Sequence, residues 1–400
     1  GMVQAQNEFR SAQEIQPDFA MAYWGEAFTY QHPFFGQKDA GPGEALMRLG
    51  ATSAERLAKA PTDREKGFLL AAEAYALTVG GMPERRIAWM NAMAELYAKY
   101  PDDFEVKAFY TASMLSGATA SGADSQRINM QAGALALEMF KENDNHPGAA
   151  HYVIHSFDDP VHAPIALEAA TAYADIAPAV SHARHMPTHI FIQHGMWNEV
   201  SVWNDSAFNA GLELWSEGDS TGDMNHSSNW GQYGDLQLGD LEKSERWIKR
   251  GQMVLDNAPS SARAASTVKT MRARHIIESK QWHLQPLTDD LDATELLALG
   301  LSAAHLGDLA VANQVVAKLD KMLADSPDNG QLKIVHHEVA ALTLHKESMQ
   351  QALVEGAKRQ RAIELIQEAM NIREGQRAPN GAATPLKPVH ELAAEMMLEM

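Results

Sequence analysis

Residues 166–178 read ALEAATAYADIAP, and this stretch decides the fold class. Small and apolar residues recur in it at helical spacing as far as Pro178, a residue that cannot continue a helix. The same form occurs in FRSAQEIQPDFAMAYWGEAFTY (residues 9–30) and in MAELYAKYPDDFEVKAFY (residues 93–110), where Pro17 and Pro101 follow the helix. Alternating runs typical of strands are almost absent. The sequence therefore predicts a chain built only of helices.

A period of about 34 residues with helix–turn–helix character is the signature of tetratricopeptide (TPR) repeats. Gly195 falls on the glycine position between the two helices of a unit, and Gly239 and Gly307 repeat this local pattern two periods of about 34 residues apart. We expect an all-α, TPR-like α-α superhelix, that is, a solenoid of antiparallel helix pairs.

The array is expected to span residues 1–400 as a single solenoid. Within it we distinguish N-terminal repeats at 3–116, central His-rich repeats at 125–260, and C-terminal repeats with a cap at 261–400. The spacing is looser at about 117–124 and 374–388, and KPVHEL near the C-terminus marks the start of a last capping helix.

Composition limits the partners. With 52 acidic against 33 basic side chains the formal net charge is -19, so the field of the chain repels nucleic-acid phosphates and anionic membranes. We therefore expect no binding to nucleic acid, and no apolar run is long enough for membrane insertion. Cysteine is absent, so any metal must be held by histidine and oxygen.

The start of the chain bears on the compartment. Gly1-Met2 precedes an amphipathic stretch over residues 3–16 that is typical of the second helix of a pair, so we expect that the first helix of the pair is missing. An export signal could have been removed with it. This leaves the compartment open, and the absence of cysteine favours an exported or periplasmic protein over a cytoplasmic one.

Chemistry is concentrated between His146 and His226. The sequence there contains HPGAAHYVIHSFDDPVHAP and SHARHMPTHIFIQHG, followed after a predicted helix by NHSSNWGQYGDLQLGD. Nine of the 17 histidines of the protein fall in this region: His146, His151, His155, His162, His182, His185, His189, His194 and His226.

Helical spacing places several of these histidines on shared faces. His182, His185 and His189 occupy positions on the face of a first helix that points away from the packing residues and lines the concave groove of a stacked array. His151 and His155 lie one turn apart in the preceding unit. His226 takes the equivalent position in the following unit, so we expect residues from three units to converge.

Paired imidazoles one turn apart can bind a divalent transition metal together, zinc or copper being the best candidates. The expected set combines the pair His151/His155 with the pair His185/His189, either as four nitrogens or as three with an open position. Asp159, together with Asp158, could ligate the ion or orient a ring. The predicted metal ligands are His151, His155, His182, His185, His189, His226 and Asp159.

Two simpler interpretations of these histidines stay open. A single histidine on a helix is more often packed or hydrogen-bonded than a ligand, and the group could be a hydrogen-bonded or pH-sensitive network. His146, His162 and His194 fall off the predicted groove face or at helix ends, where capping and loop roles are expected.

The middle motifs, with the opening PDFAMAYWGEAFTYQHPFF and the closing KPVHEL, resemble a family of bacterial TPR proteins that carry H-P-G-A-A-H-Y-x-I-H and H-M-x-x-H-I-F. The resemblance spans nearly the whole chain and implies the superhelical fold. It suggests that the family's marked positions are His146, His151, His155, His162, His182, His185, His189 and His226. Where the family has an aromatic residue after the last of these histidines, this chain has Ser227. The resemblance supplies no reaction.

Three function classes follow from these features. The first is a binding protein whose groove takes a peptide, a protein or a small molecule and whose histidines hold a metal. The second is a metal-dependent enzyme in which His151, His155, His185 and His189 hold zinc, copper or iron and an aspartate acts as base. The third is a protein-interaction scaffold in which the histidines are incidental. We place the first ahead of the others.

Overall fold

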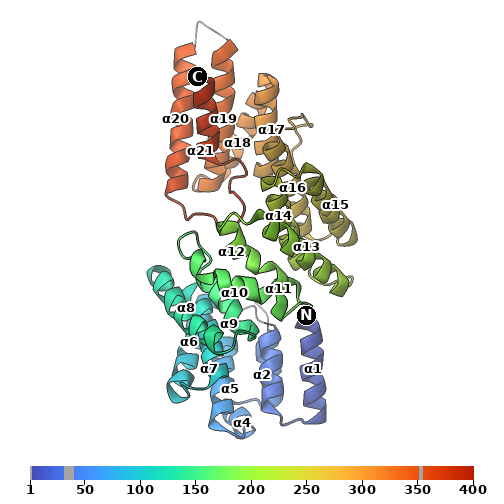
Figure 1. Ribbon diagram of the computed structural model, residues 1–400, viewed down its shortest axis with the longest axis vertical. Helices are drawn as coiled ribbons and strands as arrows, with labels where there is room; N and C mark the ends of the chain where they lie inside the picture. The colour runs from blue at the N-terminus through green and yellow to red at the C-terminus, as the bar shows by residue number, and fades with distance from the viewer. Residues whose placement is uncertain (1, 31–39, 351–354) are drawn as a thin grey trace. The chain divides into compact units, whose positions relative to one another are not determined.

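A computed structural model describes residues 2–30, 40–350 and 355–400. All regular structure in these residues is helical, and helices that follow one another along the chain pack against each other (Figure 1). The chain divides into two compact units, Gly1–Ile190 and Phe191–Met400, with the boundary inside helix α12 (Pro187–Gln193). The prediction of a TPR-like α-α fold is confirmed, whereas the division into three groups of repeats stays a prediction.

The first unit begins with the helix pair that surrounds Pro17 and ends with the histidine-bearing helices. Its elements are α1 (Met2–Ile15), α2 (Ala20–Thr29), α3 (Gly41–Leu49), α4 (Ser53–Ala58), α5 (Asp63–Leu77), α6 (Met82–Lys99), α7 (Phe104–Ala118), the 3-10 turn η1 (Gly122–Asp124), α8 (Ser125–Glu142), α9 (Pro147–Ser156), α10 (Ala163–Ile176) and α11 (Ser181–His185). The dipeptide His32-Pro33, at which the sequence predicts a helix end, lies outside the described residues.

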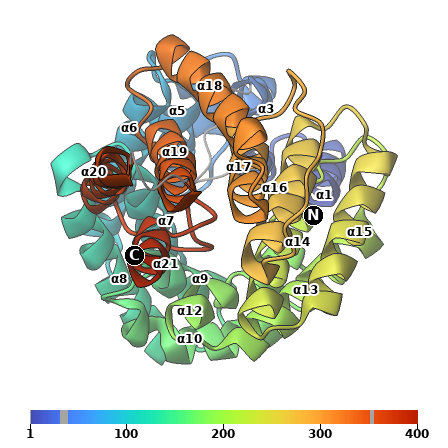
Figure 2. The ribbon, with the colours of Figure 1, turned by 90° about the horizontal axis from the view of Figure 1, so that it is seen from above.

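The second unit continues the same alternation of helix and short turn. Its elements after α12 are α13 (Trp197–Leu214), α14 (Gly222–Gln237), α15 (Leu241–Asn257), α16 (Ala262–Ser279), α17 (Ala293–Leu306), α18 (Leu309–Asp325), α19 (Gly330–Gln350), α20 (Glu355–Glu374) and α21 (Val389–Glu399). Within this unit α14, α15 and α16 lie side by side, as do α17, α18 and α19 (Figure 2).

The turns follow from the residues that punctuate the sequence. Pro17, Pro101 and Pro178 come directly after α1, α6 and α10, where a proline stops the helix. Gly239 and Gly307 follow α14 and α17 with φ of 75° and 80°, the left-handed conformation that closes a helix and that glycine adopts without steric cost. The repeat signals read from the sequence therefore mark the actual helix ends.

Aromatic and aliphatic side chains fill the spaces between helices. In the first unit Trp24, Phe28, Phe68 and Phe109 pack edge to face or tilted, with ring centroids 4.9–5.9 Å apart. Such pairs add about 1 kcal/mol beyond the burial of their area. This aromatic cluster joins α2, α5 and α7.

The last segment of the second unit is extended. Between α20 and α21 the chain runs through residues 375–388, where Pro385, Leu386 and Lys387 are buried. A Cβ added at Gly381 would lie 2.7 Å from Cζ2 of Trp230, so the backbone passes directly over the indole of that α14 residue. The capping helix expected from KPVHEL is confirmed as α21, and the extended segment ties it to α14.

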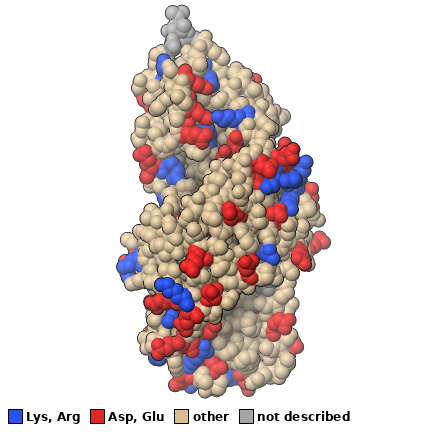
Figure 3. Space-filling model, in the orientation of Figure 1, with Lys and Arg blue, Asp and Glu red and all other residues tan. Residues whose placement is uncertain are grey.

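Charges are dispersed over the surface. On the face shown in Figure 3, Asp and Glu side chains are scattered among Lys and Arg, with no basic stripe. No helix in the described part of the chain is long and apolar enough to cross a membrane.

Candidate metal centre

Helix α9 presents two histidines on one side. Pro147 occupies the first turn, and the side chain of His146 caps the helix because its Nδ1 accepts a hydrogen bond from the backbone N–H of Ala149 at 3.0 Å. The capping role expected for His146 is confirmed. Val153 and Ile154 are buried, whereas His151 and His155 are only half-buried, with ring centroids 4.6 Å apart. The α9 sequence therefore separates a packing face from an imidazole face.

The third member of this group comes from α11. The Nε2 atoms of His151 and His182 lie 3.2 Å apart, and one ring nitrogen from each of His151, His155 and His182 lies within 4.8 Å of the others. We call these three residues the histidine triad. The sequence predicted that His182, His185 and His189 would all meet the α9 pair; of these three, His182 lies in this group.

Position along α11 accounts for this difference. His182 and His185 are three residues apart, so their side chains are rotated by about 60° from each other and displaced by about one turn along the axis. The short helix ends at His185 and α12 begins at Pro187, so that His185 and His189 belong to different helices. A proline cannot continue a helix, and Pro187 inside HMPTH indicates this restart from the sequence.

His185 and His189 form a second group, which we call the histidine pair. Their Nε2 atoms are 3.1 Å apart, and the two residues are only 2% and 9% exposed. The expectation that both line an open groove is therefore wrong: they are buried, because α11 and α12 turn this face inward after the break at Pro187. Their replacement would disturb packing as well as any ligand site.

A carboxylate orients one ring of the histidine pair. Nδ1 of His189 lies 2.8 Å from Oδ2 of Asp158, whose side chain is 9% exposed. The carboxylate can only accept, so Nδ1 carries the proton and Nε2 of His189 offers a lone pair toward His185. A carboxylate behind a ligating histidine is the usual outer partner in protein metal sites. Asp158, rather than Asp159, has this position.

Asp159 serves a different histidine. Its carboxylate contacts Nδ1 of His162 at 2.8 Å and accepts the backbone N–H groups of Val161 and His162. These donors lower the pKa of Asp159 although burial opposes them. Asp159 therefore closes the turn between α9 and α10, and His162 has the local loop role expected for it.

His226 lies in the second unit. It belongs to α14, and its ring packs edge-on against Trp230 with centroids 5.6 Å apart. The expectation that it joins the other histidines stays a prediction.

Two tyrosines that the sequence did not single out flank the histidine triad. Tyr173 of α10 stacks on His151 at a centroid distance of 5.4 Å and an angle of 11°. Burial raises the pKa of Tyr173, and it raises the pKa of Tyr152 to about 12. Both phenols are therefore neutral at physiological pH and act as walls. Their spacing looked like ordinary packing, and no pattern in the sequence distinguished them.

Comparisons with known proteins add little to this geometry. No protein-family model matches the chain, and no curated protein is significantly similar to it. Among solved structures, it is similar to a chain of the human IFIT1 dimer with m7Gppp-AAAA, with 13% identity and a TM-score of 0.40, over 95% of this chain and 83% of that chain. At this level of similarity nothing about ligands is transferred.

The nitrogen separations fit joint coordination. Ligands bound to zinc at the usual Zn–N distance in a tetrahedron lie roughly 3.3 Å apart. The Nε2 atoms of His151 and His182 are 3.2 Å apart, and those of the histidine pair are 3.1 Å apart. The same distances fit an N–H···N hydrogen bond in which one ring donates and the other accepts. The arrangement can therefore hold a metal or a proton between the rings.

Proposed function

We propose that this TPR-like protein binds a divalent transition metal, zinc or copper, at the histidine triad. The observation that supports this most directly is the meeting of three imidazole nitrogens from α9 and α11 within 4.8 Å. A hydrogen-bonded network needs only two rings at a time, since a neutral imidazole has one donor and one acceptor. A third nitrogen at the same point favours a cation.

Three nitrogen ligands leave a coordination position open. The triad residues are all half-buried, so this position is reached from solvent, and the stacked ring of Tyr173 forms one wall. We infer that a donor atom of a small molecule or a peptide completes the coordination. The function is thus ligand binding through a metal, on a helical scaffold.

The histidine pair is a second place for the same chemistry. Asp158 fixes the proton of His189 on Nδ1, which prepares its Nε2 as a ligand. His185 and His189 are buried whereas the histidine triad is half-buried and open to solvent, so we expect the triad to fill first.

Metal titration of protein purified without an affinity metal column tests the proposal. We expect zinc or copper to bind with at least one equivalent and to raise the melting temperature, because a ligand of the folded state stabilises it by mass action. His182→Ala should weaken binding by at least about 100-fold, since loss of an outer-shell partner alone costs 10–100-fold. His283→Ala, at an exposed position outside the cluster, is the matched control.

Circular dichroism of the metal-free variants completes this experiment. His182 is half-buried, so His182→Ala should keep its helical content without metal. If His182→Ala folds and still binds metal with full affinity, the triad is not the site. If wild-type protein binds no zinc or copper, the histidines form a hydrogen-bonded network and the proposal fails.

A metal-dependent enzyme is the second candidate function. Three protein ligands with an open position are typical of catalytic zinc sites, where the ion lowers the pKa of a bound water and polarises a carbonyl. Zinc-dependent hydrolysis of an activated ester that disappears in His182→Ala would support this candidate. Metal binding without such activity would leave the binding protein.

A further inference from the structure

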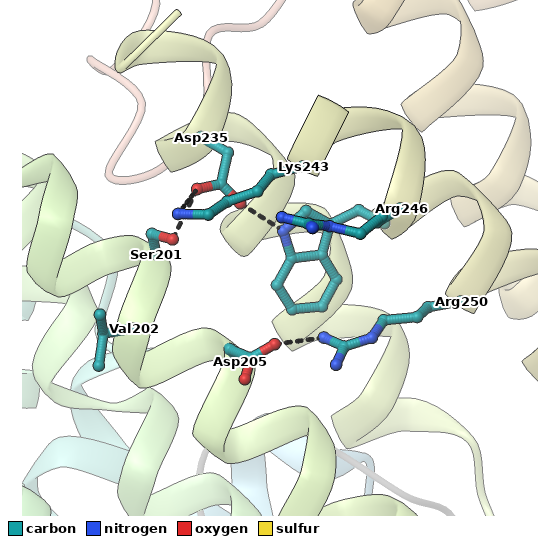
Figure 4. A pocket seen from close by; sticks show the side chains of 8 residues that line it. Ser201, Val202, Asp205, Asp235, Lys243, Arg246 and Arg250 are labelled. Atoms are coloured by element: carbon teal, nitrogen blue, oxygen red, sulfur yellow. Dashed lines mark hydrogen bonds and ion pairs between the residues drawn. The ribbon is translucent and has the colours of Figure 1, made fainter. Parts of the chain in front are cut away.

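A pocket of about 470 Å³ opens in the second unit, apart from all the central histidines discussed above (Figure 4). Its walls come from α13 and α15, and Asp235 of α14 contributes a carboxylate. A volume of this size is in the range of small-molecule sites and is too small for a folded partner. We propose that it binds a small organic monocarboxylate.

Three cations line the pocket from one helix. Lys243, Arg246 and Arg250 follow one another on α15 at spacings of three and four residues, so they share one helix face. Figure 4 shows their side chains lying along the same wall. The chain as a whole has a net charge of -19, so a group of three neighbouring cations departs from its overall acidic character.

Two of these cations have carboxylate partners. Arg250 is paired with Asp205, and its guanidinium lies over the ring of Trp247 at 4.9 Å. Lys243 lies 3.6 Å from Asp235, a carboxylate that is only 1% exposed, and 3.6 Å from Asp240. Both partners of these ion pairs are therefore held in place before any ligand arrives.

The buried carboxylate is satisfied from other sides as well. Asp235 accepts a hydrogen bond from the hydroxyl of Ser201 at 2.6 Å and one from the indole N–H of Trp247 at 2.7 Å. These bonds fix Asp235 as part of the wall.

Arg246 is the remaining cation. Among the ion pairs of the described residues none includes it, and the residue is exposed at the pocket mouth. Lys243 and Arg250 each have carboxylate partners, so Arg246 is the one pocket cation outside the ion pairs of the described residues, and a single carboxylate neutralises its charge. A phosphate monoester carries nearly two negative charges at neutral pH and would overcompensate it. The planar guanidinium also matches a carboxylate with two parallel hydrogen bonds.

The pocket also has an apolar part, which can contact the rest of the ligand. Val202 and Trp247 line the same pocket, and Figure 4 shows Val202 on the wall opposite the α15 cations. A ligand with a carboxylate at Arg246 and a short hydrocarbon or aromatic body would contact this wall. Benzoate and hexanoate have this composition, whereas acetate lacks the body.

Calorimetry or ligand-observed NMR with benzoate, hexanoate, acetate and inorganic phosphate tests this site, with EDTA present so that no histidine-bound metal contributes. We expect benzoate or hexanoate to bind more tightly than acetate and phosphate. Arg246→Gln should weaken binding at least tenfold, because a charge-assisted hydrogen-bond pair is lost. Lys249→Gln, an exposed cation on the same helix but outside the pocket, should change nothing.

A second variant is expected to strengthen ligand binding instead of weakening it. Asp205→Asn removes the partner of Arg250 and leaves a second uncompensated cation, so carboxylate binding should become tighter and phosphate binding should improve most. The proposal is overturned if neither organic carboxylate binds, if Arg246→Gln binds them as well as wild type, or if phosphate is preferred by the unchanged protein.

Discussion

Single residues decide which chemistry the helices present. Asp158 and Asp159 are adjacent, yet one fixes the proton of the buried His189 and the other closes a turn with His162. The sequence showed that both aspartates lie near histidines, but it could not show which ring each would face. That choice depends on how the chain turns after Phe157, a feature that helical periodicity does not describe.

Asp158→Asn tests the role of this carboxylate. The amide can accept from Nδ1 of His189 but carries no charge, so it makes His189 a poorer ligand without leaving a cavity. If the histidine pair binds metal, we expect affinity for the second equivalent to fall by 10–100-fold while the first is retained, as measured by zinc titration. Asp144→Asn, at an exposed loop position, is the matched control. Loss of the first equivalent instead would show that the pair, not the triad, is the tighter site.

His337 makes stability depend on pH. Burial, reinforced by the neighbouring His336, lowers its pKa to about 4, and Glu368, Lys333 and Arg361 also face it. In the unfolded chain a histidine has a pKa near 6.5, so between about pH 6.5 and 4 only the unfolded chain binds the proton. The free energy of unfolding should therefore fall as the pH falls through this window, by about 1.4 kcal/mol for each pKa unit of difference.

His337→Gln should flatten this dependence. Urea unfolding at pH 7, 6, 5 and 4 would measure it, and the loss of stability on acidification should be smaller in the variant than in wild type. Parallel curves for wild type and His337→Gln would contradict the assignment.

At the scale of the helices, the sequence predicted where helices end better than it predicted which side chains of different helices meet. Proline and glycine act within a few residues of their own position, so Pro178 and Gly307 could be placed from the sequence alone. The grouping of His151 with His182 depends instead on the packing of α10 against both α9 and α11, which local spacing does not encode. The spacing that puts Lys243, Arg246 and Arg250 on one face of α15 is visible in the sequence. Asp205 and Asp235, which line the same pocket, come from α13 and α14, and the sequence does not show that they lie there.

Gly307→Ala tests the turn between α17 and α18. Nothing lies within 4 Å of an added Cβ, so the only cost is the φ of 80°, and we expect a loss of about 1 kcal/mol. Gly307→Asn should lose less, because asparagine tolerates this conformation. Gly356→Ala, which also has open space but lies inside α20, should be neutral or slightly stabilising. Equal effects at both glycines would argue against the left-handed turn.

At the scale of the whole molecule, the chain divides into two compact units, and the histidine triad lies entirely within the first. The monocarboxylate pocket lies entirely within the second. Variants in one site should therefore leave the other unchanged unless the units communicate, and double titration with zinc and benzoate would measure any such coupling.

Gly381→Val tests how the second unit is closed. A side chain at this position would meet the ring of Trp230, so the extended segment and α21 should detach from α14. We expect faster hydrogen exchange in α14 and α21, with no change in α1 to α10. Ala378→Val, an exposed change in the same segment, is the control. Unchanged exchange in α14 would show that the segment does not hold the unit together.

The contact between Gly381 and Trp230 has a consequence for the order in which the protein folds during its synthesis on the ribosome. Lys280 and Glu395 are 115 residues apart in the sequence and form an ion pair at 2.9 Å. Trp230 and Gly381, which lie against each other, are even further apart in the sequence. Contacts so distant in sequence form late and slow a fold that is otherwise built from neighbours. The first unit can assemble while synthesis continues. The second unit, however, must keep the indole of Trp230 exposed until the final residues emerge, so nascent chains arrested before residue 381 are where chaperone dependence and aggregation should be greatest.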